Sequence, residues 1–319
     1  MSDGGMIVLP RTHPILKSAV EHQLELAEEV KNQDPNLDSK EKKKLGALSM
    51  TFYDFETSEY KVSINPKSSS VLTVSLRLPC YSEIKDTGVT DMLEKSYGDL
   101  VVDTEKGFSV SLAFDVMDPP KPKKELVELV INLKENILTA PLLLYFNEMK
   151  SGSLTDPFNF NLRPDTKMYI VPASGRVTVA LRIALDNKVD LQVAEIFLKD
   201  YKEVQRRKAG GAPPALFSIN APEEVKGESR YSPEEKHVGF LTFAVQQQQM
   251  RNPKNTAAAL VNFRSFLQYH LKCSKAFFHS RMRKKVREFL KVLNRAKTDF
   301  EGETKKKAKK TASGRVFKK

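Results

Sequence analysis

The sequence predicts an α+β protein: two tandem, similar domains, each an antiparallel sheet covered by helices, and then a long C-terminal helix. Three observations lead to this prediction. Alternating apolar and polar residues mark strands in both halves, and the order of elements in the first half recurs in the second. Neither proline nor glycine occurs between Lys254 and Glu301. Because neither half alternates strictly between strand and helix, antiparallel pairing is favoured over a parallel sheet.

The first half begins with a helix over 15–30, where apolar residues recur at helical spacing. A polar loop follows at 34–44. Strands are then expected at 51–53, 60–64, 71–78 and 108–116, with a helix at 91–97. Region 125–149 is apolar and mostly helical. Pro141 is its expected kink or restart, since proline removes a helical hydrogen bond.

The second half repeats this order. Strands are expected at 168–171 (closed by Pro172), 176–183, 216–219 and 238–245, with a helix at 191–204, a break at 208–214 and a loop at 221–236. The sequence at 71–78 aligns with 176–183, and 130–134 aligns with 260–264. Two amphipathic strands can align by chance, but the matching order of elements favours an internal duplication.

The predicted domain boundaries follow from this duplication. They place a first domain at 1–150, a second at 151–250, the long helix at 251–301 and a basic, disordered tail at 302–319. The helix is expected to complete the second domain with its first half, through Phe263, Leu267, Leu271 and Phe278. As one helix, 255–300 would be about 70 Å long, which is more than one small domain can cover.

The far half of this helix carries a regular apolar seam. Its members step by four and three residues, the spacing of a helix that pairs with another helix. They are Met282, Val286, Phe289, Leu293, Ala296 and Phe300. The chain has no other uncommitted helix of that length, so the seam predicts a partner's helix.

Positive charge is concentrated at the same end of the chain. The net charge is +12, yet residues 270–319 hold 18 Lys and Arg against 4 Asp and Glu, a balance of +14. An acidic polymer or surface is therefore the expected partner, whether nucleic acid, an anionic membrane or an acidic protein. The Lys-rich stretch at 305–310 suits a nuclear signal, a polyanion-binding arm or a solubilising tail equally well.

The sequence contains no motif that predicts catalysis, a cofactor or a metal. Phosphate-binding and dinucleotide-binding glycine loops, a G-x-S-x-G elbow and an H-E-x-x-H pair are all absent. His270 and His279 are about 14 Å apart along a helix, too far to share a metal. Cys80 and Cys273 do not form a disulfide scaffold, and Cys273 is expected to be buried among apolar neighbours. No apolar run is long enough for membrane insertion, and an intracellular location is expected.

The C-terminal helix also carries a family resemblance. Tyr269–Ala276, His279, Arg281–Arg283 and Phe289–Ala296 closely resemble the C-terminal helix of the subunit 2 family of the actin-related protein 2/3 complex. Ser96-Tyr97-Gly98 and Arg176–Val179 look similar to that family as well. The first 150 residues match it more loosely.

The resemblance implies an actin-filament-binding structural subunit without a catalytic residue or cofactor. It implies pairing with subunit 4 through the long helix, contact with the mother filament during nucleation of branched actin, and a cytoplasmic, cytoskeletal location at actin patches or the cell cortex. The candidate filament contacts are Lys272, Lys275, Arg281, Arg283 and Lys284 on the helix and Arg206, Arg207 and Lys208 in the second domain. Lys284 matches the family less well than the other four helix positions, and Gly210-Gly211 departs from the family near the Arg pair.

A basic nucleic-acid-binding protein is the alternative. The basic helix and tail suit it, but a groove-binding helix does not need a partner-facing seam as far as Phe300. Aromatic residues flanked by Lys or Arg on an exposed sheet, the usual platform for stacking bases, are not evident either.

Overall fold

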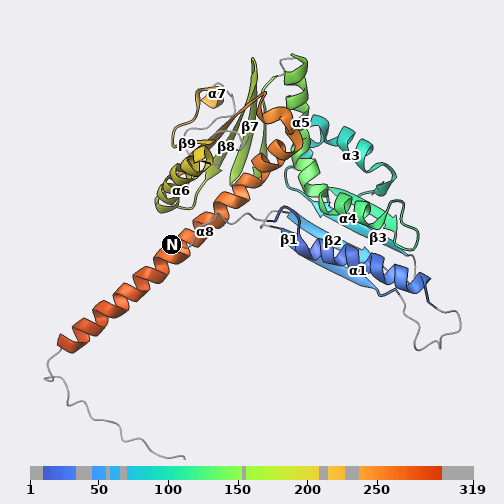
Figure 1. Ribbon diagram of the computed structural model, residues 1–319, viewed down its shortest axis with the longest axis horizontal. Coiled ribbons are helices and arrows are strands. Elements are labelled where there is room, and N and C mark those ends of the chain that lie inside the picture. The colour runs from blue at the N-terminus through green and yellow to red at the C-terminus, as the bar shows by residue number, and fades with distance from the viewer. Residues whose placement is uncertain are drawn as a thin grey trace, which may run out of the picture. The chain divides into compact units, whose positions relative to one another are not determined.

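The computed structural model describes residues 10–33, 45–54, 58–64, 70–152, 156–207, 215–226 and 237–296 (Figure 1). Side chains are described within these ranges except at 200, 202–207 and 294–296. The predicted loop at 34–44, the break at 208–214 and the tail at 302–319 lie outside them. The chain divides into a compact unit, Met1–Leu271, and a second unit, Lys272–Lys319, and each is described by itself.

The first domain contains five strands and several helices. The strands are β1 (Leu48–Asp54), β2 (Ser58–Ile64), β3 (Val71–Arg77), β4 (Val101–Val102) and β5 (Val110–Asp115). The helices are α1 (Pro14–Lys31), α2 (Tyr81–Ile84), η1 (Lys85–Val89), α3 (Thr90–Ser96), η2 (Gly98–Leu100), α4 (Lys123–Ile131) and α5 (Leu133–Ser151). The sequence analysis did not predict β4.

The second domain also contains five strands. They are β6 (Phe158–Arg163), β7 (Thr166–Ala173), β8 (Arg176–Ala184), β9 (Ala215–Ser218) and β10 (Val238–Gln246). The helices are α6 (Lys188–Arg207), α7 (Glu223–Lys226), η3 (Gln249–Arg251) and α8 (Pro253–Ala296). The sequence analysis missed β6, and α7 falls within the predicted loop at 221–236.

The two sheets have the same topology. Both are antiparallel, in the orders β1-β2-β3-β5-β4 and β6-β7-β8-β10-β9. The aligned segments 71–78 and 176–183 form the third strand of each sheet, β3 and β8. The predicted fold class, two tandem similar domains followed by a long helix, is therefore confirmed.

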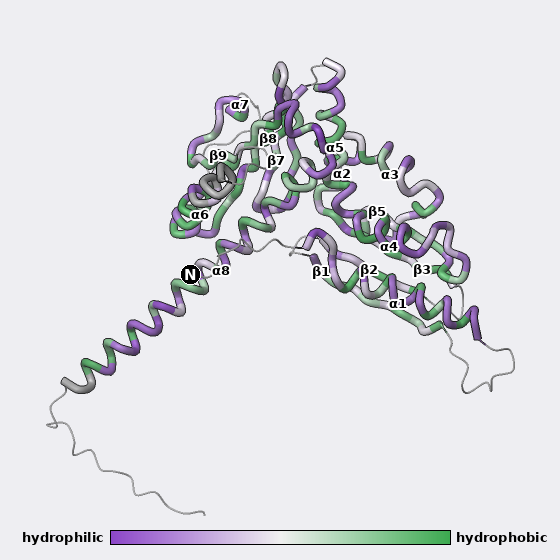
Figure 2. Tube along the Cα trace, in the orientation of Figure 1, coloured by the Kyte–Doolittle hydropathy of each residue, from purple (hydrophilic) through white to green (hydrophobic). Residues whose placement is uncertain are grey.

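Each sheet buries a face against helices, and the second sheet also buries Tyr169 and Phe240 on its other face, in a smaller cluster with Val225 of α7. In the first domain α1 and α4 pack side by side, and Leu16 and Val20 of α1 are fully buried together with Val62 of β2 (Figure 1). In the second domain Phe243 of β10 packs edge-on against Phe263 of α8, with ring centroids 5.2 Å apart. Figure 2 shows apolar residues concentrated in the strands and recurring along α8 to its described end.

Two predictions about proline were wrong. The helical region of the first domain bends by 64° between α4 and α5, at Asn132, and Pro141 lies inside α5. Likewise β7 runs through Pro172, which pairs with Val177 of β8. β6 begins only at Phe158, opposite Ile170, so β7 has no neighbouring strand on that side at Pro172 and a missing N–H is tolerated there.

Tyr97 explains the position of the bend. A helix that ends leaves its last carbonyls without partners, and the hydroxyl of Tyr97 donates to one of them, Leu129 O, at 2.9 Å. Asn136 Nδ2 of α5 donates to the same hydroxyl at 2.9 Å. Burial raises the pKa of Tyr97, so the phenol stays protonated and can donate. The motif Ser96-Tyr97-Gly98, which resembles the family, thus stabilises the α4–α5 bend through the Tyr97 hydroxyl.

Replacing Tyr97 by phenylalanine is expected to lower the free energy of unfolding by about 1–3 kcal/mol, because the partly buried Leu129 carbonyl and the Asn136 amide both lose the hydroxyl as a partner. Thermal melting of the full-length protein in its complex measures the loss. Tyr53→Phe is the matched control, because Tyr53 is exposed and its hydroxyl bonds only to Glu59, at 3.3 Å. Equal melting temperatures for the two variants would contradict the role given to Tyr97.

Candidate protein interface

The C-terminal half of α8 exposes the predicted apolar seam. Met282 and Phe289 expose 63% and 62% of their surface, and Leu293 exposes 43%. Val286 is exposed in the same way. The side chain of Ala296 and the whole of Phe300 lie outside the described residues. An exposed patch of this kind marks an interaction surface in a soluble protein.

The exposed face begins where the chain's own core ends. Leu260, Phe263, Leu267 and Leu271 are buried, and Leu271 is also the last residue of the compact unit. The prediction that Phe278 packs on the sheet was wrong, because its side chain is 53% exposed. The core of the second domain is therefore complete seven residues, or about two helical turns, earlier than the seam spacing alone indicated.

The apolar face is also broader than the predicted seam. Leu290 and Val292 are exposed large hydrophobic residues on either side of it. At 100° per residue they widen the apolar arc to about 160°, which exceeds the narrow seam of a two-stranded coiled coil. The ridge of a single helix is too narrow to cover this arc.

The predicted basic residues of α8 do not share one face. Lys272, Arg281, Arg283 and Lys284 are exposed, and the Arg281 guanidinium stacks over the Phe277 ring at 4.8 Å. Lys275 is half-buried and stands three residues before Phe278 and seven before Met282, which puts it on the side of the seam. Lys284 stands two residues after Met282, about 200° around the helix, and so lies opposite the seam.

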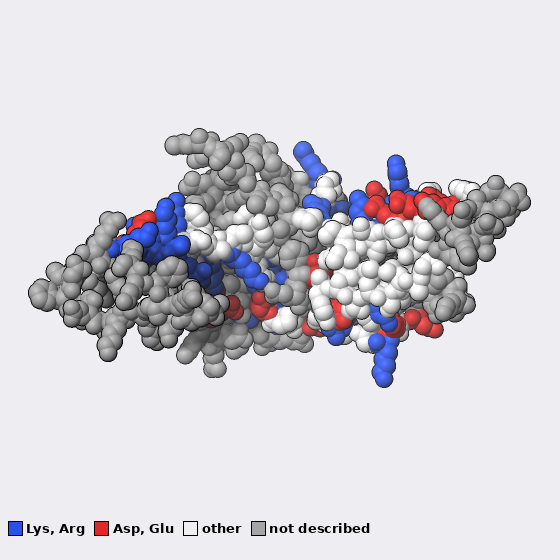
Figure 3. All heavy atoms as spheres, turned by 90° about the horizontal axis from the view of Figure 1, so that it is seen from below, with Lys and Arg blue, Asp and Glu red and all other residues white. Residues whose placement is uncertain are grey.

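Two further basic residues of α8 extend the stripe that begins at Arg283. Arg287 and Lys291 are exposed and continue from Arg283 at intervals of four residues, which aligns the three along one stripe of the helix. Figure 3 shows Lys and Arg side chains gathering on α8. Sequence reasoning counted them in the basic run but did not select them, although their four-residue recurrence was a sufficient signal.

The second predicted basic set lies at the end of α6. Rings of α6 and α8 pack in antiparallel order, since Phe197 stacks on His270 at 4.9 Å and Tyr201 meets Phe263 at 5.2 Å. The C-terminal end of α6, which contains Arg206 and Arg207, therefore points toward the first turns of α8. Lys272 and Lys275 instead follow the last turn of α8 that packs on the compact unit. Lys208 and the side chains of 206 and 207 lie outside the described residues.

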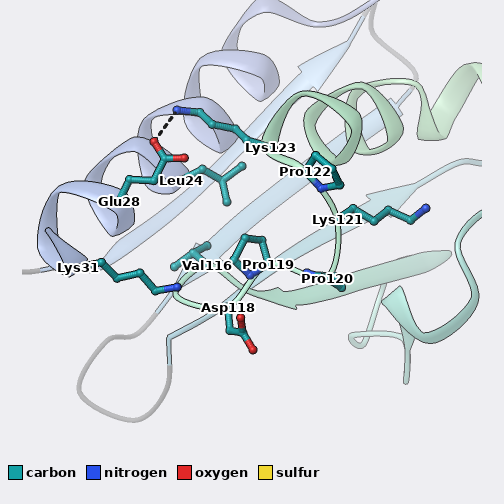
Figure 4. A pocket seen from close by; sticks show the side chains of 10 residues that line it. All are labelled: Leu24, Glu28, Lys31, Val116, Asp118, Pro119, Pro120, Lys121, Pro122 and Lys123. Atoms are coloured by element: carbon teal, nitrogen blue, oxygen red, sulfur yellow. Dashed lines mark hydrogen bonds and ion pairs between the residues drawn. The ribbon is translucent and has the colours of Figure 1, made fainter.

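A groove lies elsewhere, between α1 and the segment 118–123 (Figure 4). Its volume is about 500 Å³. Lys123 reaches Glu25 at 3.3 Å and Glu28 at 3.4 Å. Lys121 pairs with Glu125 at 2.8 Å, so the chain's own carboxylates balance two of the three lysines that line the groove.

The two cysteines differ in environment. Cys273 is exposed on α8, so the prediction of a buried Cys273 was wrong. Cys80 is buried, and burial raises the pKa of its thiol to about 12, which keeps it protonated and unreactive.

Within the described ranges no group of His, Cys, Asp and Glu side chains could hold a metal ion. No single described helix is long and apolar enough to cross a membrane, and α4 and α5 reach that length only as a bent pair.

The family described as "Arp2/3 complex, 34 kD subunit p34-Arc" matches residues 74–300. A protein of Schizosaccharomyces pombe named actin-related protein 2/3 complex subunit 2 is 30% identical over 288 residues, covering 83% of this chain and 89% of that protein. The protein of the same name from Dictyostelium discoideum is 30% identical over 270 residues, covering 84% and 90%.

The match extends through both sheets from β3 onward and along α8 beyond its described end, so it covers the duplicated architecture as well as the exposed helix. The match to the family thus covers most of the sequence. The chain belongs to the family of the 34 kD subunit, p34-Arc, of the Arp2/3 complex.

Proposed function

We propose that this protein is an actin-filament-binding structural core subunit of an actin-related protein 2/3 complex, in the place of subunit 2. Its family supports membership of that complex, in the actin cytoskeleton of the cytoplasm. In this proposal the chain scaffolds the complex and contacts the mother filament while a branch is nucleated. It acts at actin patches or the cell cortex, and it contributes surfaces rather than a catalytic step.

The exposed apolar face of α8 carries the proposal. A soluble chain does not leave eight large apolar side chains of one helix open to water unless a partner covers them. They are Phe277, Phe278, Met282, Val286, Phe289, Leu290, Val292 and Leu293. In our proposal subunit 4 covers the seam with a helix of its own, and flanking apolar surface of the complex covers Leu290 and Val292.

The basic surface supports the filament contact. Actin filaments are acidic, and exposed Lys and Arg side chains attract such a polymer over distances set by the salt concentration. On α8 the cations opposite the seam, Lys284 and Lys291, stay accessible when the seam is covered. Lys275 is on the side of the seam, and we propose that it faces a neighbouring subunit rather than actin.

The test is to purify the protein together with the chains that accompany it. We expect subunit 4 among them, and we expect the assembly to sediment with actin filaments while binding RNA on filters only weakly. A chain that purifies alone as a soluble monomer and prefers RNA would contradict the proposal and favour the nucleic-acid-binding alternative.

A further inference from the structure

Polar contacts hold α8 from two sides, just before it leaves the compact unit. Arg264 is 3% exposed; it forms an ion pair with Asp165 and donates from Nε to Thr166 Oγ1 at 2.9 Å. Asp165 lies in the turn of the β6–β7 hairpin, and Thr166 is the first residue of β7. Asn262 donates from Nδ2 to Glu135 Oε2 of α5 at 2.8 Å. One short stretch of α8 is thus tied to both domains.

The same hairpin makes two more contacts with α8. Arg163, near the end of β6, is 8% exposed and donates to Ser265 Oγ at 2.5 Å and to Gln268 Oε1 at 3.3 Å. Three hydrogen-bonding residues of α8 therefore face the hairpin, and one faces α5. We call Asn262, Arg264, Ser265 and Gln268 the α8 anchor.

The first domain has a counterpart of the central contact. Lys134 of α5 pairs with Asp54, at the end of β1, at 2.7 Å, as Arg264 pairs with Asp165. In the aligned segments 130–134 and 260–264, Lys134 and Arg264 are equivalent. Burial lowers the pKa of Lys134, and Asp54 partly offsets that effect. A buried cation on the helix and an aspartate of the first hairpin thus recur in both domains.

The equivalent asparagines agree as well. Asn132 and Asn262 precede the cations by two residues, and each donates from Nδ2 to the carbonyl four residues earlier, at 2.8 and 2.9 Å. The first domain then breaks its helix at Asn132, whereas α8 continues without a break from Pro253 to Ala296. Only in the second domain does the anchored helix go on to form an interface.

The α8 anchor can fix the rotation of α8 about its own axis, which apolar packing alone does not determine. Hydrophobic contact is not directional, so a helix with a broad apolar face can turn about its axis at little cost. Buried polar pairs are directional and are the better-attested means of fixing register. Asn262 and Arg264 are about 200° apart around the helix, so their contacts hold it from nearly opposite sides.

We propose that the α8 anchor consists of positioning residues, which set the rotation and register of α8 for the interface farther along it. The inference rests on the proposed function of that interface. Because α8 is one continuous helix, a turn at Arg264 turns the seam and the basic stripe with it. A slip of one residue would rotate both by about 100° and point the wrong face at each partner.

The test compares three variants within the assembled complex. Arg264→Met removes the cation while keeping most of the side-chain volume, and it is expected to give about tenfold fewer branches, equivalent to about 1.4 kcal/mol. Arg264→Lys is expected to branch at nearly the wild-type level, because a lysine, Lys134, forms the equivalent ion pair in the first domain. Lys254→Met is the matched control, since Lys254 is an exposed cation on the first turn of α8.

Three measurements are needed: subunit stoichiometry, branch density, and hydrogen exchange of residues 262–271. The inference expects Arg264→Met to assemble with normal stoichiometry, exchange faster in this segment and branch poorly. Normal branching by assembled Arg264→Met would overturn it, as would a loss by Arg264→Lys as large as that of Arg264→Met.

A second variant covers the case in which Arg264→Met does not fold. Asn262→Ala with Gln268→Ala removes one contact on each side of α8 while the ion pair between Arg264 and Asp165 stays in place, and it should lose branching in the same direction. Unchanged branching by this double variant would also overturn the inference. Failure of the proposed function gives a different result, because the wild-type complex itself would then not bind filaments. In that case hydrogen exchange of residues 262–271 alone tests the role of the anchor.

Discussion

Replacing Phe289 by aspartate is expected to prevent the protein from assembling with its partner subunits. The side chain lies at the centre of the exposed apolar face and is 62% exposed in the chain alone. Once a partner covers it, truncation to alanine alone should cost about 2–5 kcal/mol. A carboxylate there adds the penalty of a buried, unpaired charge, which is larger still. Co-expression with tagged subunit 4 and a pull-down measures the loss.

Ser280→Asp is the matched control for this variant. Ser280 is exposed two residues before Met282, on the opposite side of α8, so the same carboxylate there should leave assembly intact. The wild-type chain expressed without partners is expected to be poorly soluble, because its apolar face stays open. Normal assembly by Phe289→Asp, together with a soluble wild-type monomer, would remove the basis for a partner at this face.

Reversing the charge of Arg206 and Arg207 to glutamate is expected to weaken filament binding and branching strongly while the complex stays assembled. The change moves the local charge by four units, and like charges facing an acidic polymer repel it. The loss should be largest at low salt and should shrink as the Debye length falls from about 10 Å at 0.1 M to about 3 Å at 1 M. Cosedimentation with actin filaments across a salt series measures it.

The control for this variant must carry the same change in net charge. Lys85→Glu with Lys95→Glu reverses two exposed lysines of the first domain and should leave filament binding close to wild type. If both double variants bind equally well, the mother-filament contact lies away from the end of α6. If both lose binding equally, net charge rather than a local patch governs the contact.

The sequence was sufficient for the fold class, although not for β4 and β6, because period and order are local signals. Alternation in 71–78 and 176–183 identified the third strand of each sheet, and the shared element order predicted two similar domains. The α4–α5 bend was misplaced because Pro141 is a visible local signal, whereas the true bend at Asn132 depends on Tyr97, 32 residues away from Leu129 in sequence. Contacts of that range leave no periodic trace.

The candidate interface was predictable to a similar degree. The step of four and three residues identified the seam, since helical geometry alone determines which side chains share a face. Sequence reasoning took Cys273 and Phe278 for buried residues, because it could not locate where burial of α8 ends. Leu271 is the last buried residue of the described part of α8. The α8 anchor escaped notice for another reason: Arg264 and Asp165 are 99 residues apart, and ion pairs have no spacing rule.

The strand order has a consequence for biosynthesis. In each sheet the last strand of the sequence, β5 or β10, lies between two strands made earlier. The first sheet can therefore close once Asp115 has left the ribosome, while the second waits for Gln246 and the first turns of α8. Domains generally fold in this vectorial order. The apolar face of α8 emerges after every strand of both sheets, so a nascent chain exposes it only when both sheets can already be folded.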